Sequence, residues 1–113
     1  MESKRQEKIS KLLQKDLSQI LQFDSKDLYS GAMITVTKVS VTPDLAFAKT
    51  FVSIFSPGAD NTEILKSIQS YTKETRHKLA TRVKNQLRVV PDLQFYIDDS
   101  LDYIENIENL LKK

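Results

Sequence analysis

The fold is decided by residues 72–100, which read TKETRHKLATRVKNQLRVVPDLQFYIDDS. A helix over the first part of this stretch, at 3.6 residues per turn, has an apolar side and a basic side. The apolar side carries Leu79, Val83, Gln86 and Leu87, and the basic side carries Lys73, His77, Lys84 and Arg88. The first side is suited to packing on a sheet, and the second is suited to contact with water or an anion.

Pro91 separates this helix from a strand. A proline has no amide donor and restricts the preceding Val90 to extended dihedrals, so we expect the helix to end in the region 88–90. Beyond it, Leu93, Phe95 and Ile97 alternate with polar residues and Tyr96, which is the period-two pattern of a half-buried strand. A helix joined to a strand by a short connection predicts a layered arrangement of helices and sheet.

The composition excludes several classes of protein. A chain of 113 residues with 40% hydrophobic content is suited to one domain over residues 1–113. The absence of cysteine and the presence of a single histidine exclude a disulfide scaffold, thiol chemistry and the usual His/Cys zinc sites. No run approaches the roughly 20 apolar residues of a membrane span, and the first basic residues are not followed by the apolar run of a secretory signal. We expect a soluble, unprocessed and cytoplasmic protein without a membrane partner.

The charges are sorted along the chain although the net charge is only +2. Residues 1–15 hold five Lys or Arg against two acidic residues, and residues 66–88 hold seven against one. Residues 16–65 and 89–113 are acidic, with six acidic residues in each against three and two basic ones. This distribution predicts a concentrated positive face that is suited to a polyanion.

The first basic block coincides with a predicted helix from Ser3 to Phe23. Its apolar residues recur at spacings of three and four, and they are Ile9, Leu12, Leu13, Leu17, Ile20 and Leu21. Four lysines lie within about 60° of one another around this helix, and Arg5 is next to them in the sequence. These lysines are Lys4, Lys8, Lys11 and Lys15. The stripe is either a solvated helix face or a surface for RNA phosphates.

Two strands are predicted in the middle of the chain. Residues 24–32 have the composition of a loop, and the strand at 33–41 changes its apolar parity, which a bulge near Thr37 or Lys38 explains. A tight turn at 42–44 leads to a strand at 45–55. One face of this strand carries Ala46, Ala48, Thr50, Val52 and Ile54, and the other carries Phe47, Lys49, Phe51, Ser53 and Phe55. The aromatic face is either covered, most economically by the last helix, or a contact surface.

Three further helical features are predicted. Asp60 and Glu63 have the spacing of a capping box, and the helix that follows changes its phase between Ser70 and Lys73, which predicts a bend or a second helix there. Residues 98–100 have N-cap chemistry for a last helix that carries Leu101, Ile104, Ile107 and Leu111. The predicted order is α-β-β-α-α-β-α, in an α+β domain with a three-stranded sheet and helices mainly on one face.

This order resembles a KH-like domain, and particular residues resemble one family, bacterial ribosome-binding factor A. The first group of matching residues is Pro43, Asp44, Leu45, Ala46, Ala48 and Lys49. The second is Arg76, Leu79, Arg88, Pro91, Leu93, Phe95, Asp98 and Ser100. The resemblance spans residues 4–111. At the helix junction, where the family has small residues, this chain has Tyr71, Thr72 and Lys73, and it lacks the GxxG loop with which ordinary KH domains bind single strands.

The resemblance implies an assembly factor that binds the maturing small ribosomal subunit and its precursor rRNA. It also implies a role in late processing near the 5′ end of that rRNA and in growth in the cold. We expect a monomer without cofactor, metal or small-molecule substrate. The alternative is a protein-interaction module that uses the aromatic strand face or the acidic last helix, with only incidental RNA contact.

The candidate RNA-binding residues come from both basic blocks. They are Lys4, Arg5, Lys8, Lys11, Lys15, Tyr71, Lys73, Arg76, Lys84 and Arg88. Arg76 and Arg82 border the apolar side of their helix, so packing with a carboxylate partner is an equal alternative for them. Tyr71 either stacks on an unpaired base or covers the helix bend.

No residue pattern supports an enzyme. His77 falls on the solvent side of its helix, without a serine, cysteine or carboxylate at a catalytic spacing. Asp98 and Asp99 are adjacent strand residues that point to opposite faces, and helix capping explains them. We therefore expect a non-enzymatic binding protein.

Overall fold

The computed structural model describes residues 3–56, 58 and 60–98. Its elements are α1 (Lys4–Leu28), β1 (Met33–Val41), β2 (Phe47–Phe55), α2 (Asn61–Ser70), α3 (Thr72–Val83) and β3 (Asp92–Ile97). The sheet has the order β1-β2-β3, in which β1 and β2 are antiparallel and β2 and β3 are parallel. The predicted α+β order is thus confirmed as far as β3, and the predicted last helix lies outside the described residues.

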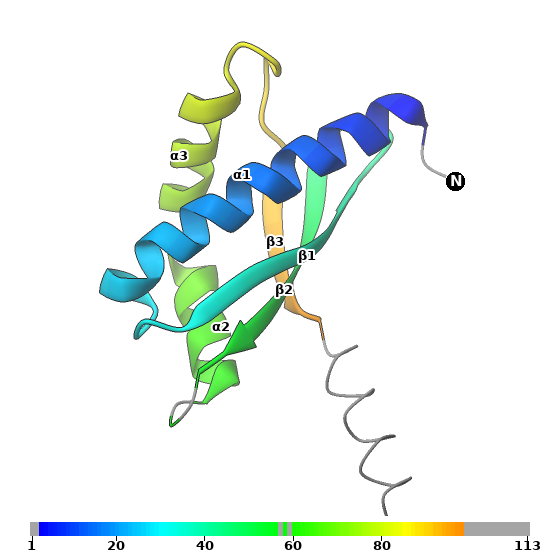
Figure 1. Cartoon of the computed structure of the whole chain (residues 1–113). Coiled ribbons are helices and arrows are strands. Elements are labelled where there is room, and N and C mark those ends of the chain that lie inside the picture. Colours follow the sequence, from blue (N-terminus) through cyan, green and yellow to red (C-terminus); the bar gives the residue numbers. More distant parts are fainter. Residues whose placement is uncertain (1–2, 57, 59, 99–113) are drawn as a thin grey trace, which may run out of the picture.

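The three helices cover one face of the sheet, and α1 runs diagonally across it (Figure 1). Alternate strand residues point to this face and are buried with the helices' apolar residues in one core. The strand residues of the core are Ile34, Val36, Val39, Val41, Ala48, Val52, Ile54, Leu93 and Phe95. The parity predicted for β3 is therefore confirmed.

Helix α1 starts as expected but is longer than predicted. Ser3 is its N-cap and forms a capping box with Gln6. The prediction of a loop from residue 24 was wrong, because the helix continues to Leu28 with Asp24 and Ser25 buried. Lys78 lies 2.7 Å from the Asp24 carboxylate, and the Ser25 hydroxyl donates to the carbonyl of Ala32. Tertiary partners therefore satisfy the side chains of Asp24 and Ser25, for which the sequence pattern predicted a loop.

Polar side chains of α1 bond to the backbone of β1, which is an edge strand. Gln6 donates to the Val41 carbonyl at 2.9 Å, and Gln14 donates to the carbonyls of Val36 and Thr37 at 3.2 Å. Gln22 accepts from the Ile34 amide at 2.9 Å. On the opposite edge strand, Gln69 of α2 donates to the Phe95 carbonyl at 3.0 Å. Helix side chains thus occupy backbone groups at both edges of the sheet.

The β1–β2 hairpin confirms the predicted bulge, since its register shifts between Val36 and Lys38. The second strand begins at Phe47, so the predicted start at Leu45 was wrong. Leu45 has a positive φ of 60° and donates its amide to the Thr42 carbonyl at 2.8 Å. It therefore belongs to the turn, and Ala46, which we expected on the buried face, is exposed.

The helix junction lies at Tyr71, which confirms the predicted bend between Ser70 and Lys73. Asp60 is the N-cap of α2 and accepts from the Thr62 amide at 2.8 Å. The ring of Tyr71 makes an edge-to-face contact with buried Tyr29, with centroids 6.2 Å apart. Burial raises the pKa of the Tyr29 hydroxyl.

Helix α3 is shorter than predicted. It ends at Val83 rather than in the region 88–90, and residues 84–91 lead to β3 without regular helix. Gln86, which we placed on the apolar side, is exposed, whereas Leu79 and Val83 are buried as expected. Asn85 is a residue that favours helix ends, and Leu87 packs back on the core from the loop.

Candidate nucleic-acid interface

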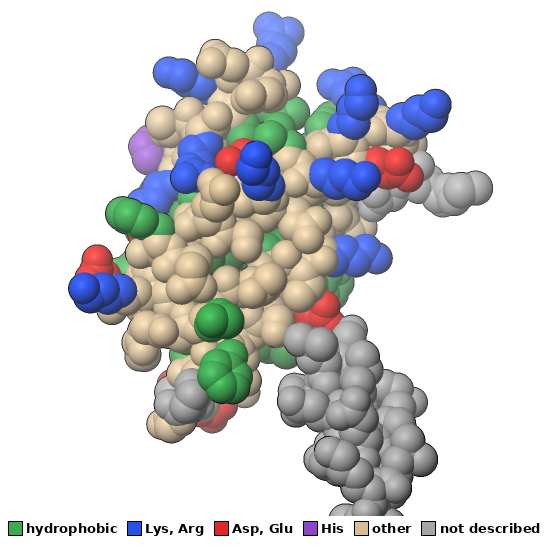
Figure 2. All heavy atoms as spheres, viewed as in Figure 1, with side chains coloured by type: hydrophobic (Ala, Val, Ile, Leu, Met, Phe, Trp, Pro, Cys, Tyr) green, Lys and Arg blue, Asp and Glu red, His purple; other side chains and the backbone are tan. Residues whose placement is uncertain are grey.

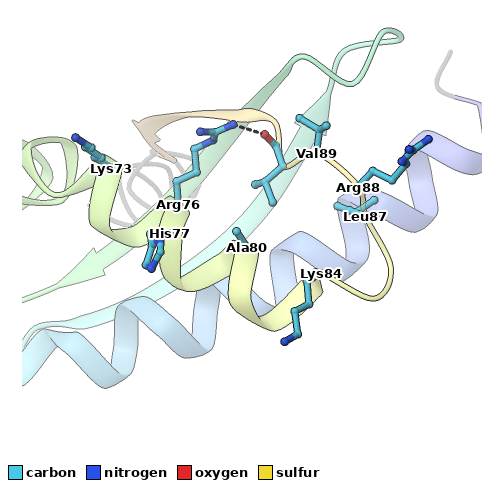
Figure 3. Close-up of a pocket in the computed structure, with 9 residues that line it drawn as sticks. Lys73, Arg76, His77, Ala80, Lys84, Leu87, Arg88 and Val89 are labelled. Carbon is cyan, nitrogen blue, oxygen red and sulfur yellow. Dashed lines mark hydrogen bonds between the residues drawn. The ribbon is translucent and has the colours of Figure 1, made fainter.

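A basic groove lies between α3 and the segment 84–90 that follows it (Figure 3). Its volume is about 520 Å³. Its basic lining residues are Lys73, Arg76, His77, Lys84 and Arg88, and its apolar lining residues are Ala80, Leu87, Val89 and Val90. The structure thus brings together all four of the predicted Lys and Arg residues from the second basic block, although Lys84 and Arg88 lie beyond the helix that was expected to carry them.

Arg76 holds the two sides of the groove together. Its guanidinium donates to the carbonyls of Val90 at 2.6 Å and Pro91 at 3.2 Å, and it lies 3.6 Å from the carboxylate of Asp92. Figure 3 shows the Arg76 side chain reaching from α3 to this backbone. Arg76 thus has the carboxylate partner that we expected as one alternative, and it shapes the groove from within; RNA contact by Arg76 stays a prediction.

Two other cations of α3 point to α1 instead. Lys78 pairs with buried Asp24, and Arg82 lies 3.3 Å from the Asp16 carboxylate and 2.8 Å from the Gln19 side-chain oxygen. The carboxylate partner predicted for Arg82 is thus confirmed. These ion pairs fix α3 on α1 and distinguish structural cations from those that line the groove.

A second hollow connects the groove to the N-terminal part of α1. Its volume is about 320 Å³, and its lining residues are Arg5, Lys8, Ile9, Leu12, Gln86 and Leu87. Because Leu87 lines both hollows, they are neighbours on one surface. The structure therefore brings residues of the two basic blocks, 1–15 and 66–88, next to one another.

The other lysines of the predicted stripe extend this surface along α1. Lys4, Lys11 and Lys15 are exposed, and the helical period places them next to Lys8. Figure 2 shows Lys and Arg side chains gathered along the upper part of the molecule, over the N-terminal half of α1 and the end of α3. We call the groove, the second hollow and these lysines the basic surface.

The remaining predicted residues lie at its border. Tyr71 is half-buried, and its contact with Tyr29 agrees with the reading that it covers the helix bend. His77 is exposed on the groove side of α3, as expected. The Asp98 carboxylate accepts a hydrogen bond from the Thr37 hydroxyl, whereas the capping role predicted for residues 98–100 falls largely outside the described residues.

Sequence reasoning missed the loop that forms one wall of the groove. A helix continued to Arg88 would have made Lys84 and Arg88 part of a convex ridge rather than a concave site. Asn85 was the available signal for the earlier end of the helix. The packing of Leu87 on the core is tertiary and has no signal in the spacing.

Other kinds of site find no support in the described part of the chain. No cluster of three or more His, Asp or Glu residues there is placed to hold a metal ion. Within the same residues, no helix combines the length and the hydropathy that a membrane crossing requires.

Comparison with known proteins places the chain in a family. The family profile described as ribosome-binding factor A matches residues 5–111. The ribosome-binding factor A of Christiangramia forsetii is 47% identical over 112 residues, which cover 98% of this chain and 85% of that protein.

Solved structures show the same fold. The crystal structure of ribosome-binding factor A from Thermus thermophilus aligns with a TM-score of 0.67 and 20% identity, over 81% of this chain and 94% of that one. A homology model of the Thermus thermophilus factor, fitted into a cryo-EM map of its complex with the 30S subunit, aligns with a TM-score of 0.61 and 21% identity, over 78% and 89% of the two chains. By its profile match and its curated relative, this chain belongs to the ribosome-binding factor A family.

Proposed function

We propose that this protein binds the small ribosomal subunit by docking its basic surface on rRNA. The observation that carries the proposal is the groove in which Lys73, Lys84 and Arg88 lie beside Arg76 and His77. Lys and Arg side chains spaced along a groove can neutralise successive phosphates of an RNA backbone. The family membership and the 30S complex of the Thermus thermophilus protein support the subunit as the partner.

The proposed contact reads charge and shape rather than base sequence. Lys73, Lys84 and Arg88 line the groove next to apolar side chains, and the chain has no GxxG loop. The adjoining cations of α1 widen the footprint beyond a single helix. Specificity then comes from the shape of the rRNA site, which must match both α1 and the loop after α3.

We further propose that binding accompanies late maturation of the small-subunit rRNA near its 5′ end and is needed most in the cold. The support for this role is the family resemblance. The protein would act as a monomer in the cytoplasm, by holding rRNA rather than by catalysis.

Charge reversal in the groove tests the RNA contact. The variant Lys84→Glu/Arg88→Glu is compared with Lys26→Glu/Lys66→Glu, which changes the net charge equally at exposed residues outside the basic surface. Affinity for purified small subunits is measured by sedimentation across a series of salt concentrations. We expect the groove variant to bind much more weakly and to lose about 2 units of the slope of log K against log salt, since each phosphate contact contributes about one.

Two results would contradict the proposed contact. One is an affinity of the native chain that does not change with salt. The other is an equal loss of affinity in the groove variant and its control, which would assign binding to overall charge. Binding that survives groove reversal but is lost with ribosomal proteins removed would instead support the protein-interaction alternative.

The maturation role needs a separate experiment in cells that lack their own ribosome-binding factor A. The native chain and the groove variant are expressed in these cells at low temperature, and unprocessed 5′ ends of small-subunit rRNA are quantified. We expect the native chain to lower the precursor fraction and restore growth, and the groove variant to do neither. Subunit binding without any change in the precursor would overturn the maturation role alone.

A further inference from the structure

The face of the sheet that points away from the helices carries an aromatic stripe. Phe47, Phe55 and Tyr96 are 44%, 66% and 42% exposed, although large apolar side chains usually avoid water. Phe51 is half-buried and contacts Tyr96, with ring centroids 5.7 Å apart. Met33, which pairs with Phe55 in the sheet, is 62% exposed. Exposed aromatic side chains that recur along one face of a sheet indicate a surface that something covers.

Two cations stand beside the stripe. Lys38 pairs with Phe51 across the β1–β2 register, and Lys49 pairs with Gln94 across the β2–β3 register. Both lysines are exposed. The segment that covers the stripe should therefore combine apolar residues with negative charge.

The end of β3 delivers the chain to this face. Asp98 follows Tyr96 by two residues and so points to the same side. Its amide donates to the Val52 carbonyl at 2.8 Å, and its carboxylate accepts from the Thr37 hydroxyl on β1, which lies on the far side of β2. The described part of the chain therefore ends at Asp98, beside Val52 in the middle of β2.

The sequence that follows has the required chemistry. In residues 101–111, LDYIENIENLL, the side chains of Ile104, Ile107 and Leu111 share one side of a helix. Asp102 and Glu105 fall on the other side, and Leu101 and Glu108 lie at the border. The apolar residues include Leu101, Ile104, Ile107 and Leu111, and the acidic ones are Asp102, Glu105 and Glu108. A helix of this length would span about 16 Å, and the stretch of β2 from Phe47 to Phe55 spans about 26 Å, so the stripe can accommodate it.

We propose that residues 101–111 dock as an amphipathic helix on the aromatic stripe, with their acidic side chains near Lys38 and Lys49. The linker of two residues, Asp99 and Ser100, makes docking intramolecular, so it is favoured over an equally apolar segment from another molecule. The sheet then has helices on both faces, and the basic surface is the side open to rRNA.

A tryptophan reporter tests the docking, because the chain contains no tryptophan. The substitution Phe51→Trp places a single reporter on the stripe. Its acrylamide quenching is measured in the full chain, in Ile104→Asp/Ile107→Asp and in Asn106→Asp/Asn109→Asp. The two double variants add equal charge, but only the first disrupts the apolar side of the proposed helix.

We expect a blue-shifted, poorly quenched emission in the full chain and in the Asn variant. In the Ile variant and in a chain truncated after Ser100, we expect a red shift and a severalfold larger quenching constant. Equal quenching in all four proteins would overturn the proposal. Quenching that depends on protein concentration would also overturn it, because the cover would then be a second copy. A cooperative thermal unfolding transition that is retained in the Ile variant distinguishes loss of docking from loss of folding.

Discussion

Lys78 and Lys73 of α3 have the same side chain but different surroundings. Lys78 is paired at 2.7 Å with Asp24, whose side chain is only 10% exposed, whereas Lys73 is exposed at the mouth of the groove. A buried carboxylate without its partner is costly, because its desolvation is no longer offset by an ion pair. We therefore expect Lys78 to serve stability and Lys73 to serve binding.

The substitution Lys78→Met tests this difference, with Lys73→Met as the matched control. We expect Lys78→Met to lower the free energy of unfolding by about 1–2 kcal/mol, a value reduced by the partial exposure of Lys78. We expect Lys73→Met to change it by less than about 0.5 kcal/mol and to weaken rRNA binding instead. Urea denaturation and subunit sedimentation of both variants measure the two effects. The reverse order of stabilities would contradict the assignment.

Asp44 makes the hairpin turn sensitive to acid. Its carboxylate accepts hydrogen bonds from the Thr42 hydroxyl at 2.6 Å and from the Ala46 amide at 3.1 Å. Both bonds lower the pKa of Asp44 below its ordinary value of 3.8, and the bond from Thr42 has the larger effect. Because the pKa of Asp44 is lower in the folded than in the unfolded protein, the ionised carboxylate stabilises the fold at a pH above the pKa of the unfolded state. This stabilisation is lost as the pH falls through the pKa of the folded state.

The variant Asp44→Asn should therefore be less stable than the native chain at neutral pH. The difference should vanish once the pH is below the lowered pKa, where the native carboxyl is also neutral. Thermal unfolding of both proteins between neutral pH and acid measures this convergence. A stability difference that is constant over the whole range would show that the charge of Asp44 is not the cause.

At the scale of elements, the joints of α3 determine the shape of the groove. Tyr71 sets the angle at the start of α3, and Arg76 fixes the loop at its end through two backbone carbonyls. A lysine cannot reproduce two hydrogen bonds from one planar group. Arg76 therefore fixes the end of this wall nearest β3, in addition to the packing of Leu87 and Val90 on the core.

The conservative substitution Arg76→Lys should loosen this wall. We expect the free energy of unfolding to fall by only about 1 kcal/mol, since the Arg76 side chain is 41% exposed and water partly replaces its partners. We also expect faster amide exchange in residues 84–90. Hydrogen exchange followed by NMR locates the change. Exchange that accelerates equally over α1 would contradict a local clamp.

Tyr71 is the second joint, and two substitutions separate its roles. Tyr71→Phe keeps the ring that contacts Tyr29, and we expect its stability and its rRNA affinity to equal those of the native chain. Tyr71→Ala removes the contact and should cost about 1–2 kcal/mol of unfolding free energy. Calorimetry and subunit binding check both variants. A large loss of affinity in Tyr71→Ala without a loss of stability would support base stacking.

These joints also show which features can be read from the sequence. The parity of Leu93 and Phe95 and the bulge at Thr37 and Lys38 are local patterns, and each is confirmed. The ends of α1 and α3 are set by tertiary contacts, such as the pair of Asp24 with Lys78, which no local pattern contains. The cations of the site were predictable from charge, but their concave arrangement depends on where α3 ends.

At the scale of the whole molecule, charge is separated although the net charge is small. The basic surface joins α1 and α3, and Asp60 and Glu63 lie at the start of α2, away from the basic groove. Such a molecule approaches a polyanion in a preferred orientation, because one side is attracted more strongly than the other. We therefore expect ionic strength to control the rate of the proposed docking as well as its strength.

We expect the glutamines at the sheet edges to protect the molecule against association with other copies. The variant Gln14→Ala/Gln22→Ala frees the backbone groups of β1 that bond to those two side chains. The control Gln86→Ala/Gln94→Ala changes two exposed glutamines that do not bond to a strand edge in the described structure. We expect only the first variant to exchange the Ile34 amide faster and to scatter more light at high concentration. Equal scattering from both variants would contradict a protective role.

The occupied edges of the sheet also limit how this protein can bind a partner. A partner that added a strand would bind main-chain groups, which every sequence possesses, and evolution could adjust such a contact only slowly. With carbonyls at Val36, Thr37, Val41 and Phe95 already engaged, recognition is directed to side chains. Each determinant of binding can then be gained, lost or retuned by a single codon change while the backbone stays the same.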